Sequence, residues 1–445
     1  MAQRLVVIGG GAAGMSAASA ARRVDPAGEI VVLEATGHAA YGLCGIPYYL
    51  AGLIGRADEL LSYPPAYFRE RRRIDLRLHT RALALDPQRQ VVHYRDTRQE
   101  GRLRYDRLVV AAGGAPVLPP VPGLDDDRVV TVRTLDDAIT LRSLLDAGRI
   151  ARALVVGAGY VGLEMAEALH ARRVAVTVTE ALPRVMPTLD EPVAALVADE
   201  VRRHGVDLRL GARFAGVTRD EHGLIALIGG DALPVDLVVL AIGVRPTADV
   251  AALAGARTGP GGALLVDEKM HTSLERVYAA GDCIAPQHLV LGRPAFVPLG
   301  PAGNKTGRVA GTVAAGGQAR FRGVVGTAVV KVFGLGVART GLTLAEAQAE
   351  FGPGAAATDI VGRSRAKYYP GAEPVTVRLV HDAGGRLLGA QMVSAGDVAK
   401  RIDVEAAAAL MGVNLLDRAV WPAAVEAGLA QALSCADPVR AIWPA

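Results

Sequence analysis

The chain has 445 residues, of which 51% are hydrophobic and 21% are charged, so it is long enough to form two or three globular domains. Its net charge of +4 is small and its arginines are scattered, which argues against a nucleic-acid-binding protein. The three cysteines, at positions 44, 283 and 435, are too few and too widely spaced for a disulfide framework. No run of 18 apolar residues predicts a membrane span, and we expect a cytoplasmic protein.

The N-terminal segment predicts a strand, a glycine-rich turn and a helix. Residues 4–8 (Arg-Leu-Val-Val-Ile) predict a buried parallel strand, and the sequence Gly-Gly-Gly-Ala-Ala-Gly at 9–14 opens an alanine-rich helix that we expect to reach about residue 23. The next strand, 30–34, ends in a glutamate that can accept hydrogen bonds from a ribose. In such a motif the glycines make the turn, let the backbone approach a pyrophosphate, and let the helix pack on the strand. The predicted dinucleotide contacts are Gly9, Gly11, Ala12, Ala13, Gly14 and Glu34.

The same pattern returns further along the chain. A strand at 153–156 is followed by a glycine motif at 157–162, a helix to about residue 172, and a strand that ends at Glu180, 23 residues after Gly157. We therefore predict two related, doubly wound α/β domains. A carboxylate at Glu180 repels a 2′-phosphate, so NADH is favoured over NADPH, although Arg184 can soften that preference. The predicted contacts in this motif are Gly157, Gly159, Tyr160, Val161, Gly162 and Glu180.

Other strands end in glycine turns that suit a bound ligand. The strand from residue 108 runs into Ala112 and Gly113, and the strand from residue 237 runs into Gly243. A third strand precedes Gly281 and Asp282, and an aspartate there can bind a hydroxylated ligand chain, although a helix N-cap is the alternative. We interpret Cys283 as a buried structural residue.

From residue 324 the pattern changes to antiparallel strands, at 327–333, 375–380 and 387–393, followed by helices at 398–410 and 421–434. We predict a separate α+β C-terminal domain that carries no nucleotide motif. The expected boundaries are 1–118 and 245–322 for the first domain, 119–244 for the second, and 323–445 for the third.

Cys44 stands alone in the stretch Tyr-Gly-Leu-Cys-Gly-Ile-Pro-Tyr-Tyr at 41–49. A reductase that uses a cysteine pair needs a second cysteine nearby, and position 49 is a tyrosine. Because Pro47 is tolerated in a first helical turn, we expect Cys44 at a helix N-terminus, where the dipole favours the nucleophilic thiolate. The alternative is a buried, inert cysteine.

Five segments carry a resemblance to a known family: 9–14, 44–49, 157–164, 280–282 and 299–308. Together they resemble the pyridine-nucleotide-disulfide oxidoreductase family. The single cysteine resembles its branch of coenzyme A-disulfide reductases, persulfide reductases and related NADH oxidases. The resemblance covers essentially the whole chain. It implies an α/β fold with FAD- and NAD(P)H-binding Rossmann-like domains and a C-terminal dimerisation domain, hence a homodimer.

The resemblance also implies residue roles. It assigns the first glycine motif to FAD and the second to NAD(P)H, with Asp282 and Asn304 near the flavin. Tyr160 gates the nicotinamide pocket beside Glu164, and Cys44 lies on the opposite flavin face. Tyr368 or Tyr369 donates a proton at the thiol, or packs at the interface. The substrate-binding candidates are Tyr48 and the pair Arg22 and Arg23, which lie where such enzymes hold phosphate; the alternative for the two arginines is a solvated helix end.

Departures from the family pattern bear on the acceptor. Members that reduce oxygen or peroxide carry a histidine where this chain has Ala12. Its absence argues against oxygen or peroxide as the electron acceptor. Members that handle coenzyme A carry Ser and Asn where this chain has Ala40 and Leu43. Near the C-terminus, a tyrosine is replaced by Cys435. We hypothesise that Cys435 of one subunit approaches Cys44 of the other, to resolve mixed disulfides or bind a soft metal; otherwise it has no role.

The sequence thus favours an FAD enzyme that uses NADH to reduce a small-molecule disulfide, persulfide or polysulfide through Cys44, with coenzyme A as one candidate. Two alternatives remain open. The first is an NADH oxidase of the same fold, and the second is a redox-sensing or electron-transfer flavoprotein whose partner is a protein.

Overall fold

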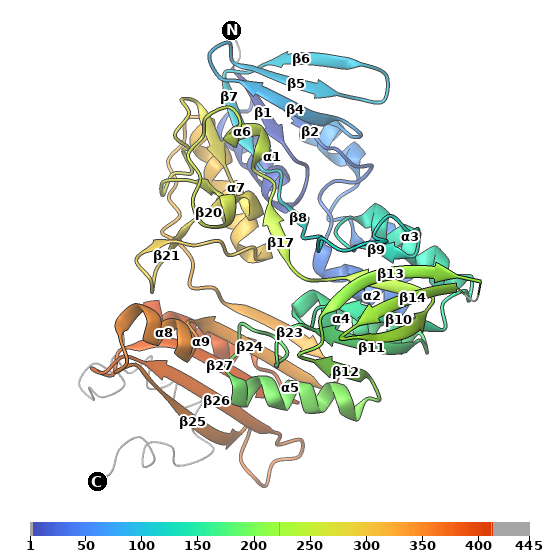
Figure 1. Cartoon of the computed structure of the whole chain (residues 1–445). Helices are drawn as coiled ribbons and strands as arrows, with labels where there is room; N and C mark the ends of the chain where they lie inside the picture. The colour runs from blue at the N-terminus through green and yellow to red at the C-terminus, as the bar shows by residue number, and fades with distance from the viewer. Residues whose placement is uncertain (1–2, 222, 411, 413–445) are drawn as a thin grey trace.

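The computed structural model describes residues 3–221, 223–410 and 412. Three regions are visible in Figure 1. The blue and yellow segments form the upper region, the green segments form the region at the right, and the orange segments form the lower region. The first domain is therefore assembled from two stretches that are far apart in the sequence.

The first domain is built on a parallel five-stranded sheet in the order β19-β7-β1-β2-β3. Val6, Val7 and Val109 in its central strands have no exposed surface. They share one hydrophobic core with residues of a helix, such as Ala17, and with residues of an antiparallel sheet, such as Val92. The strand bounds are β1 Arg4–Ile8, β2 Glu29–Leu33, β3 Asp75–Arg77, β7 Arg107–Val110 and β19 Val277–Ala279.

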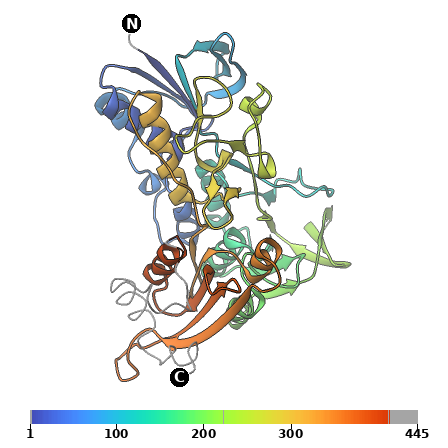
Figure 2. The same ribbon diagram turned by 90° about the vertical axis from the view of Figure 1, so that its left-hand side faces the viewer.

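Two helices from opposite ends of this domain's sequence lie side by side, α1 (Ala12–Val24) and α7 (Gly300–Ala314) (Figures 1 and 2). Their backbones touch at glycines. A Cβ atom at Gly307 would lie 2.1 Å from the carbonyl oxygen of Ala13, and one at Gly311 would lie 2.0 Å from that of Ala17. The absence of side chains there permits the close approach.

Smaller elements complete the first domain. A three-stranded antiparallel sheet consists of β4 Arg81–Asp86, β5 Val91–Arg95 and β6 Glu100–Arg104. The remaining short elements are α2 Ile46–Ala51, α6 Asp249–Ala252, β18 Leu264–Leu265, β20 Ile284–Ala285, β21 Gln287–His288 and β22 Arg293–Pro294.

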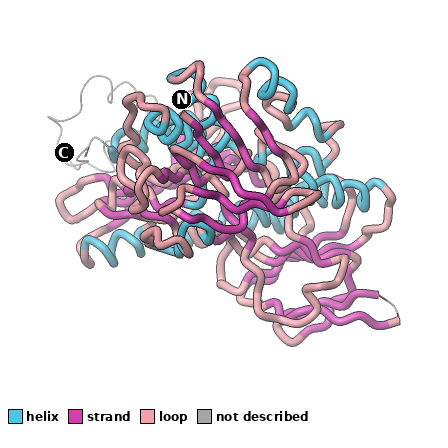
Figure 3. Tube along the Cα trace, turned by 90° about the horizontal axis from the view of Figure 1, so that it is seen from above, coloured by secondary structure: helices cyan, strands magenta, loops and turns pink. Residues whose placement is uncertain are grey.

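The second domain repeats the architecture with the parallel order β12-β11-β10-β16-β9. The strands are β9 Val129–Val130, β10 Arg152–Val156, β11 Ala175–Glu180, β12 Asp207–Leu210 and β16 Leu237–Leu240. The helices are α3 Leu135–Asp146, α4 Tyr160–Ala171 and α5 Glu191–Arg203. An antiparallel sheet, β13 Phe214–Asp220, β14 Gly223–Ile228 and β15 Asp231–Val235, projects from this domain, as Figure 3 shows in magenta. The chain crosses between the two domains in a ribbon of β8 (Gly114–Pro116) and β17 (Val244–Pro246).

The C-terminal domain is an antiparallel sheet in the order β23-β24-β27-β26-β25. Its elements are β23 Ala328–Val332, β24 Leu335–Gly341, α8 Leu344–Phe351, β25 Ala356–Arg363, β26 Pro374–His381, β27 Leu387–Ser394 and α9 Ala399–Leu410. Three of these, β24, β25 and α8, were not predicted from the sequence. The helix predicted at 421–434 lies outside the described residues.

No helix in the described ranges is long and apolar enough to cross a bilayer.

Candidate active site

The first glycine motif forms a tight turn between β1 and α1. Gly9 has a φ of 101°, which favours glycine, and a Cβ at Gly14 would lie 1.8 Å from the carbonyl oxygen of Gly9. By contrast, a Cβ at Gly11 would meet no atom within 4 Å. Gly11 caps α1 without any side-chain hydrogen bond, so the first N–H groups of the helix are left for a ligand.

Glu34 lies at the end of β2, directly beside this turn. Its carboxylate accepts a hydrogen bond from the backbone N–H of Gly10 at 2.6 Å. It also accepts bonds from the backbone N–H and the hydroxyl of Thr36, at 2.8 and 2.7 Å. These contacts hold the carboxylate at the carboxyl edge of the sheet, where such folds bind nucleotides.

The second glycine motif has the same geometry as the first. Gly157 has a φ of 103°, a Cβ at Gly162 would lie 1.9 Å from the oxygen of Gly157, and the space beside Gly159 is open. Glu180 accepts hydrogen bonds from the N–H groups of Ala158 and Leu182, at 3.0 and 2.9 Å. Helix α4 also begins without a side-chain cap. Both turns therefore have the open glycine and the free helix end that a dinucleotide pyrophosphate requires.

A third helix start converges on the first turn. Helix α7 has no side-chain cap, and the hydroxyl of Thr306 in its second turn accepts a bond from the N–H of Gly281 at 3.1 Å. Gly281 has a φ of 82°, and its Cβ would lie 2.8 Å from that of Ala13. Asn304, exposed on α7, accepts a hydrogen bond from the Ser16 hydroxyl at 3.0 Å. The α7 residues thus lie against the first glycine motif.

Arg133 is a site residue that sequence reasoning missed. It precedes α3 in the second domain, and its guanidinium donates to Asp282 Oδ2 at 2.7 Å and to the carbonyl of Gly114 at 2.9 Å. The Asp282 side chain is 18% exposed and that of Arg133 is 24% exposed. The pair joins the two domains at the point where Asp282 faces the site. An isolated arginine before a helix carries no signal for this role in the sequence.

The other predicted cofactor contacts lie at the carboxyl edges of the two sheets. Ala112 and Gly113 follow β7, and Gly113 has a φ of 71°. Gly243 follows β16 with a φ of 120° and is exposed. Ala12 is exposed at the start of α1, and Val161 is exposed in the first turn of α4. These positions surround the same two turns.

Cys44 lies in a 3-10 turn, Leu43–Gly45, directly before α2. The structure places the thiol two residues before a helix start, as expected, but its surroundings act against ionisation. Desolvation raises the pKa of Cys44, and the negative charges of Glu164 and Asp282 raise it further. Helix α2 is six residues long, and the dipole at its N-terminus acts in the opposite direction. The residue as a whole remains exposed, so a substrate can reach it.

Helix α2 brings Cys44 to the second domain. Ile46, Tyr49 and Leu50 are buried in one hydrophobic cluster with residues of the second domain that include Leu163 on α4. Arg142 of α3 donates to the carbonyl of Tyr49 at 2.6 Å. The thiol therefore sits where the two domains meet.

Two α4 residues face this junction. Desolvation raises the pKa of Glu164 to about 7, with a further contribution from the charge of Glu167. Tyr160, one turn earlier, is half-buried, and its phenol oxygen accepts a hydrogen bond from the Thr188 hydroxyl at 3.2 Å. Positions four apart lie on one face of a helix, so both side chains point toward the same side of α4.

The two arginines predicted to bind substrate differ in their exposure and in their hydrogen bonds. Arg22 is 9% exposed, and its guanidinium donates five hydrogen bonds to backbone carbonyls of residues 25–28 and 72–73. Because its guanidinium is buried in these backbone contacts, Arg22 has a structural role and does not bind substrate as predicted. Arg23 is exposed at the end of α1, and Tyr48 is 42% exposed on α2. Both remain available to a ligand.

The remaining sulfur and tyrosine candidates fall in different places. Cys283 is fully buried, which raises its pKa to about 12, as expected for a structural thiol. Tyr368 and Tyr369 are 89% and 54% exposed on the loop between β25 and β26, far out on the C-terminal domain. Cys435 lies outside the described residues.

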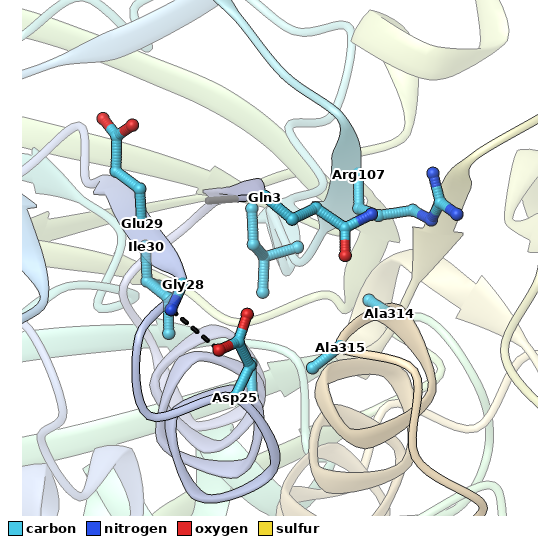
Figure 4. A pocket seen from close by; sticks show the side chains of 10 residues that line it. Gln3, Asp25, Gly28, Glu29, Ile30, Arg107, Ala314 and Ala315 are labelled. Carbon is cyan, nitrogen blue, oxygen red and sulfur yellow. Dashed lines mark hydrogen bonds between the residues drawn. The ribbon is translucent and has the colours of Figure 1, made fainter. Parts of the chain in front are cut away.

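A small cavity in the first domain is not part of this site (Figure 4). It lies at the amino ends of β1, β2 and β7, beside Gln3, Asp25 and Arg107. The glycine turns are at the carboxyl ends of the same strands. Ligands of doubly wound sheets bind at the carboxyl edge, so this cavity is on the opposite side from the candidate site.

Two family models match the chain. The model described as pyridine nucleotide-disulphide oxidoreductase matches residues 3–319, and the model of the dimerisation domain of the same family matches residues 327–421. Together they cover all three structural regions.

Individual relatives agree with this assignment. The chain is 37% identical over 419 residues to an NAD(P)H coenzyme A polysulfide/persulfide reductase of Pyrococcus horikoshii, covering 94% of this chain and 93% of that protein. It is 34% identical over 406 residues to an NADH oxidase of Methanocaldococcus jannaschii, covering 90% and 89%. Among solved structures, an NAD-dependent persulfide reductase from A. fulgidus superposes with a TM-score of 0.88 at 39% identity, covering 92% of this chain and 77% of that one.

These matches confirm the α/β fold class and the oxidoreductase activity, and they confirm the use of FAD and NAD(P)H that the family resemblance implied. The chain belongs to the pyridine nucleotide-disulphide oxidoreductase family.

Proposed function

We propose that this protein uses NAD(P)H to reduce a sulfur–sulfur bond in a small molecule through Cys44. The observation that supports this most directly is the position of Cys44. It is the one exposed cysteine in the described part of the chain, and it lies where both nucleotide-binding domains meet. A cysteine there can receive electrons that arrive from the second domain.

The residues support a two-stage reaction. The Cys44 thiolate attacks one sulfur of the substrate, a new bond to Cys44 forms, and the other sulfur leaves as a thiolate. Two electrons from NAD(P)H then cleave the mixed disulfide, which regenerates Cys44 and releases the second thiol. FAD, when bound, supplies the chemistry that accepts a hydride and passes on its two electrons.

The protein groups hold and shield the reactants. The N–H groups at the starts of α1 and α4 bind pyrophosphates, while Glu34 and Glu180 bind ribose hydroxyls. We propose that Asp282, oriented by Arg133, holds the polar chain of FAD. Because Glu180 carries a negative charge next to its motif, NADH is the preferred donor.

We propose further that coenzyme A carries the sulfur substrate. Ser62 donates its N–H to the carbonyl of Ala40 at 2.7 Å, so the segment after residue 60 runs beside the Cys44 loop. There Tyr63 stacks on Tyr67 with ring centroids 4.3 Å apart, and Tyr63 is 49% exposed. Such a surface can stack an adenine.

A basic side chain near this surface suits the phosphates of coenzyme A. Arg72 lies over the Tyr67 ring at 5.6 Å, and its carbonyl receives the Nε–H of Arg22 at 2.9 Å. The end of α1, with exposed Arg23, is therefore next to the aromatic pair. Ala40 and Leu43 provide no polar side chains near Cys44. We therefore expect the protein to recognise coenzyme A through its nucleotide end.

We propose a homodimer in which each C-terminal domain completes the partner's site. The match to the dimerisation-domain model supports this. The high exposure of Tyr368 and Tyr369 also suits residues that another subunit covers. On this arrangement one of the tyrosines donates a proton at Cys44, and Cys435 approaches the same thiol.

An NADH oxidase is the second candidate, because a relative of that name is 34% identical to this chain. Ala12 argues against it, as the histidine found in oxygen- and peroxide-reducing members is missing.

The deciding experiment is an anaerobic titration of the purified holoenzyme with NADH, followed by coenzyme A disulfide, coenzyme A persulfide, cystine or air-saturated buffer. We expect rapid flavin reoxidation by a coenzyme A sulfur compound and loss of that phase in Cys44→Ser. Reoxidation by oxygen alone at turnover rate would replace this proposal with the oxidase.

A further inference from the structure

The segment between β11 and α5, residues 181–190, connects the second glycine motif to the C-terminal domain. Directly before it, Glu180 at the end of β11 accepts a hydrogen bond from the N–H of Ala158. In its middle, the N–H of Met186 donates to the carbonyl of Ala158 at 2.8 Å. Met186 is fully buried with a φ of 44°, a backbone conformation that requires support from its surroundings. The segment is therefore packed directly on the nucleotide turn.

The other end of the segment is fastened to the C-terminal sheet. Asp190 accepts hydrogen bonds from Arg378 Nε at 3.0 Å and from Gln391 Nε2 at 2.9 Å, and it donates its own N–H to Gln391 Oε1 at 2.8 Å. The Asp190 and Arg378 side chains are each 10% exposed. A buried, fully bonded cluster of this kind fixes the backbone it holds.

Thr188 lies between these two anchors and contacts Tyr160. Its hydroxyl donates to the Tyr160 phenol oxygen at 3.2 Å. Its carbonyl accepts a hydrogen bond from Arg339 Nη1 of β24 at 3.0 Å, and the Arg339 side chain is 12% exposed. A continuous set of contacts thus runs from the C-terminal sheet through Thr188 to the first residue of α4.

We propose that Thr188 is a positioning residue that latches Tyr160 in its nucleotide-free orientation, and that Arg339 of the C-terminal domain holds the latch in place. This inference rests on the proposed use of NAD(P)H, and it takes Tyr160 as the gate of the nicotinamide pocket, the role that the family resemblance implies. A nicotinamide that enters must displace the ring and break the bond from Thr188. The latch therefore opposes nucleotide binding and keeps the pocket closed between turnovers.

The charges around Tyr160 agree with this geometry. Burial raises the pKa of the phenol, while the Thr188 hydrogen bond and then the positive charge of Arg339 act in the opposite direction. Arg339 is thus close enough to Tyr160 to influence it directly as well as through Thr188.

The test compares Thr188→Val with Thr188→Ser, which keeps the hydroxyl. The readout is the Kd of NAD⁺ for the oxidised holoenzyme, followed by the change in flavin absorbance, so no turnover is involved. Losing one neutral hydrogen bond from the free state should lower this Kd by about two- to tenfold in Thr188→Val. Thr188→Ser should bind like the wild type. An unchanged or weaker affinity in Thr188→Val would overturn the latch.

A double-mutant cycle separates the latch from a general packing effect. In a Tyr160→Phe background, Thr188→Val should cause no further change in Kd, because the phenol that it serves is gone. A full additional effect in that background would show that Thr188 acts elsewhere. Arg339→Met should shift the Kd in the same direction as Thr188→Val, and an unchanged Kd would refute the part assigned to the C-terminal domain.

The same cycle in Cys44→Ser distinguishes this inference from the proposed function. Nucleotide binding precedes all sulfur chemistry, so the Thr188 effect should persist there. If Cys44→Ser keeps full disulfide reduction while the Thr188 effect stands, the proposed sulfur chemistry fails and the latch survives. If the Thr188 effect is absent while Cys44→Ser is inactive, the latch fails alone.

Discussion

The contact between α1 and α7 offers a sharp test of how the flavin site is built. Changing Gly307 to alanine places a Cβ 2.1 Å from the carbonyl oxygen of Ala13, and ordinary contact begins at 3.4 Å. The two helices must therefore separate by more than 1 Å along this direction. Ala13 is the second residue of α1, so the displacement falls on the turn that we propose binds the FAD pyrophosphate.

Two opposing effects set the size of the change. Alanine in place of glycine favours a helix by about 1 kcal/mol, whereas overpacking typically costs about 1–3 kcal/mol and occasionally more. The new Cβ would meet the backbone of α1, and no flexible side chain lies between them that could move aside. We therefore place the overpacking cost of Gly307→Ala at the upper end of the range of about 1–3 kcal/mol. The net loss of about 2 kcal/mol corresponds to roughly a thirtyfold weaker FAD affinity if it falls on the holoenzyme alone.

The assay is FAD titration of the apoprotein by flavin fluorescence, together with thermal unfolding of the holoenzyme. Gly303→Ala is the matched control, because it lies one turn earlier in α7 and its Cβ would be 3.9 Å from the nearest atom, the Cα of Gly281. We expect Gly303→Ala to unfold at or above the wild-type temperature. Wild-type FAD affinity and stability in Gly307→Ala would refute the argument that this close approach positions the turn.

Three further substitutions test individual side chains. Arg133→Met leaves Asp282 without its partner, and we expect FAD to bind about tenfold more weakly, measured by the same titration, with Arg133→Lys intermediate. Glu164 has a pKa of about 7, so it gains a negative charge as pH rises through 7, and that charge opposes ionisation of Cys44. Glu164→Gln should therefore move alkylation of Cys44 by iodoacetamide to lower pH, and an unshifted profile would contradict this coupling. Glu180→Ala should raise kcat/KM for NADPH relative to NADH by about tenfold or more, and an unchanged ratio would show that the carboxylate does not select the donor.

The nucleotide sites could be predicted because their determinants are local. Residues 9–14 and 157–162 each encode a strand end, a turn with positive φ and a helix start within a few positions. The positive φ falls on Gly9 and Gly157, a conformation that other residues rarely adopt. The acidic residue at the end of the next strand is fixed by the parallel pairing of neighbouring strands. Both features follow from the order of residues, and the structure reproduces them in the two domains.

Several elements escaped prediction because their patterns are weak. In the C-terminal domain β24 contains two glycines and an arginine, and β25 (Ala-Ala-Thr-Asp-Ile-Val-Gly-Arg) has no regular alternation of apolar and polar residues. In the first domain β4 is mostly half-exposed. Such strands are stabilised by their pairing with neighbours, so their own sequences carry little signal.

The amino-acid order alone identified two dinucleotide turns, a solitary cysteine and a change of architecture near residue 324. It could not show that the Arg22 guanidinium donates its hydrogen bonds to backbone carbonyls, while the adjacent Arg23 is exposed. Nor could it reveal the pairing of Arg133 with Asp282 across 149 positions, or the upward pKa shift of Cys44. These properties depend on distances between residues remote in the chain, because charge, burial and hydrogen bonding act through space and arise only when the domains are packed together.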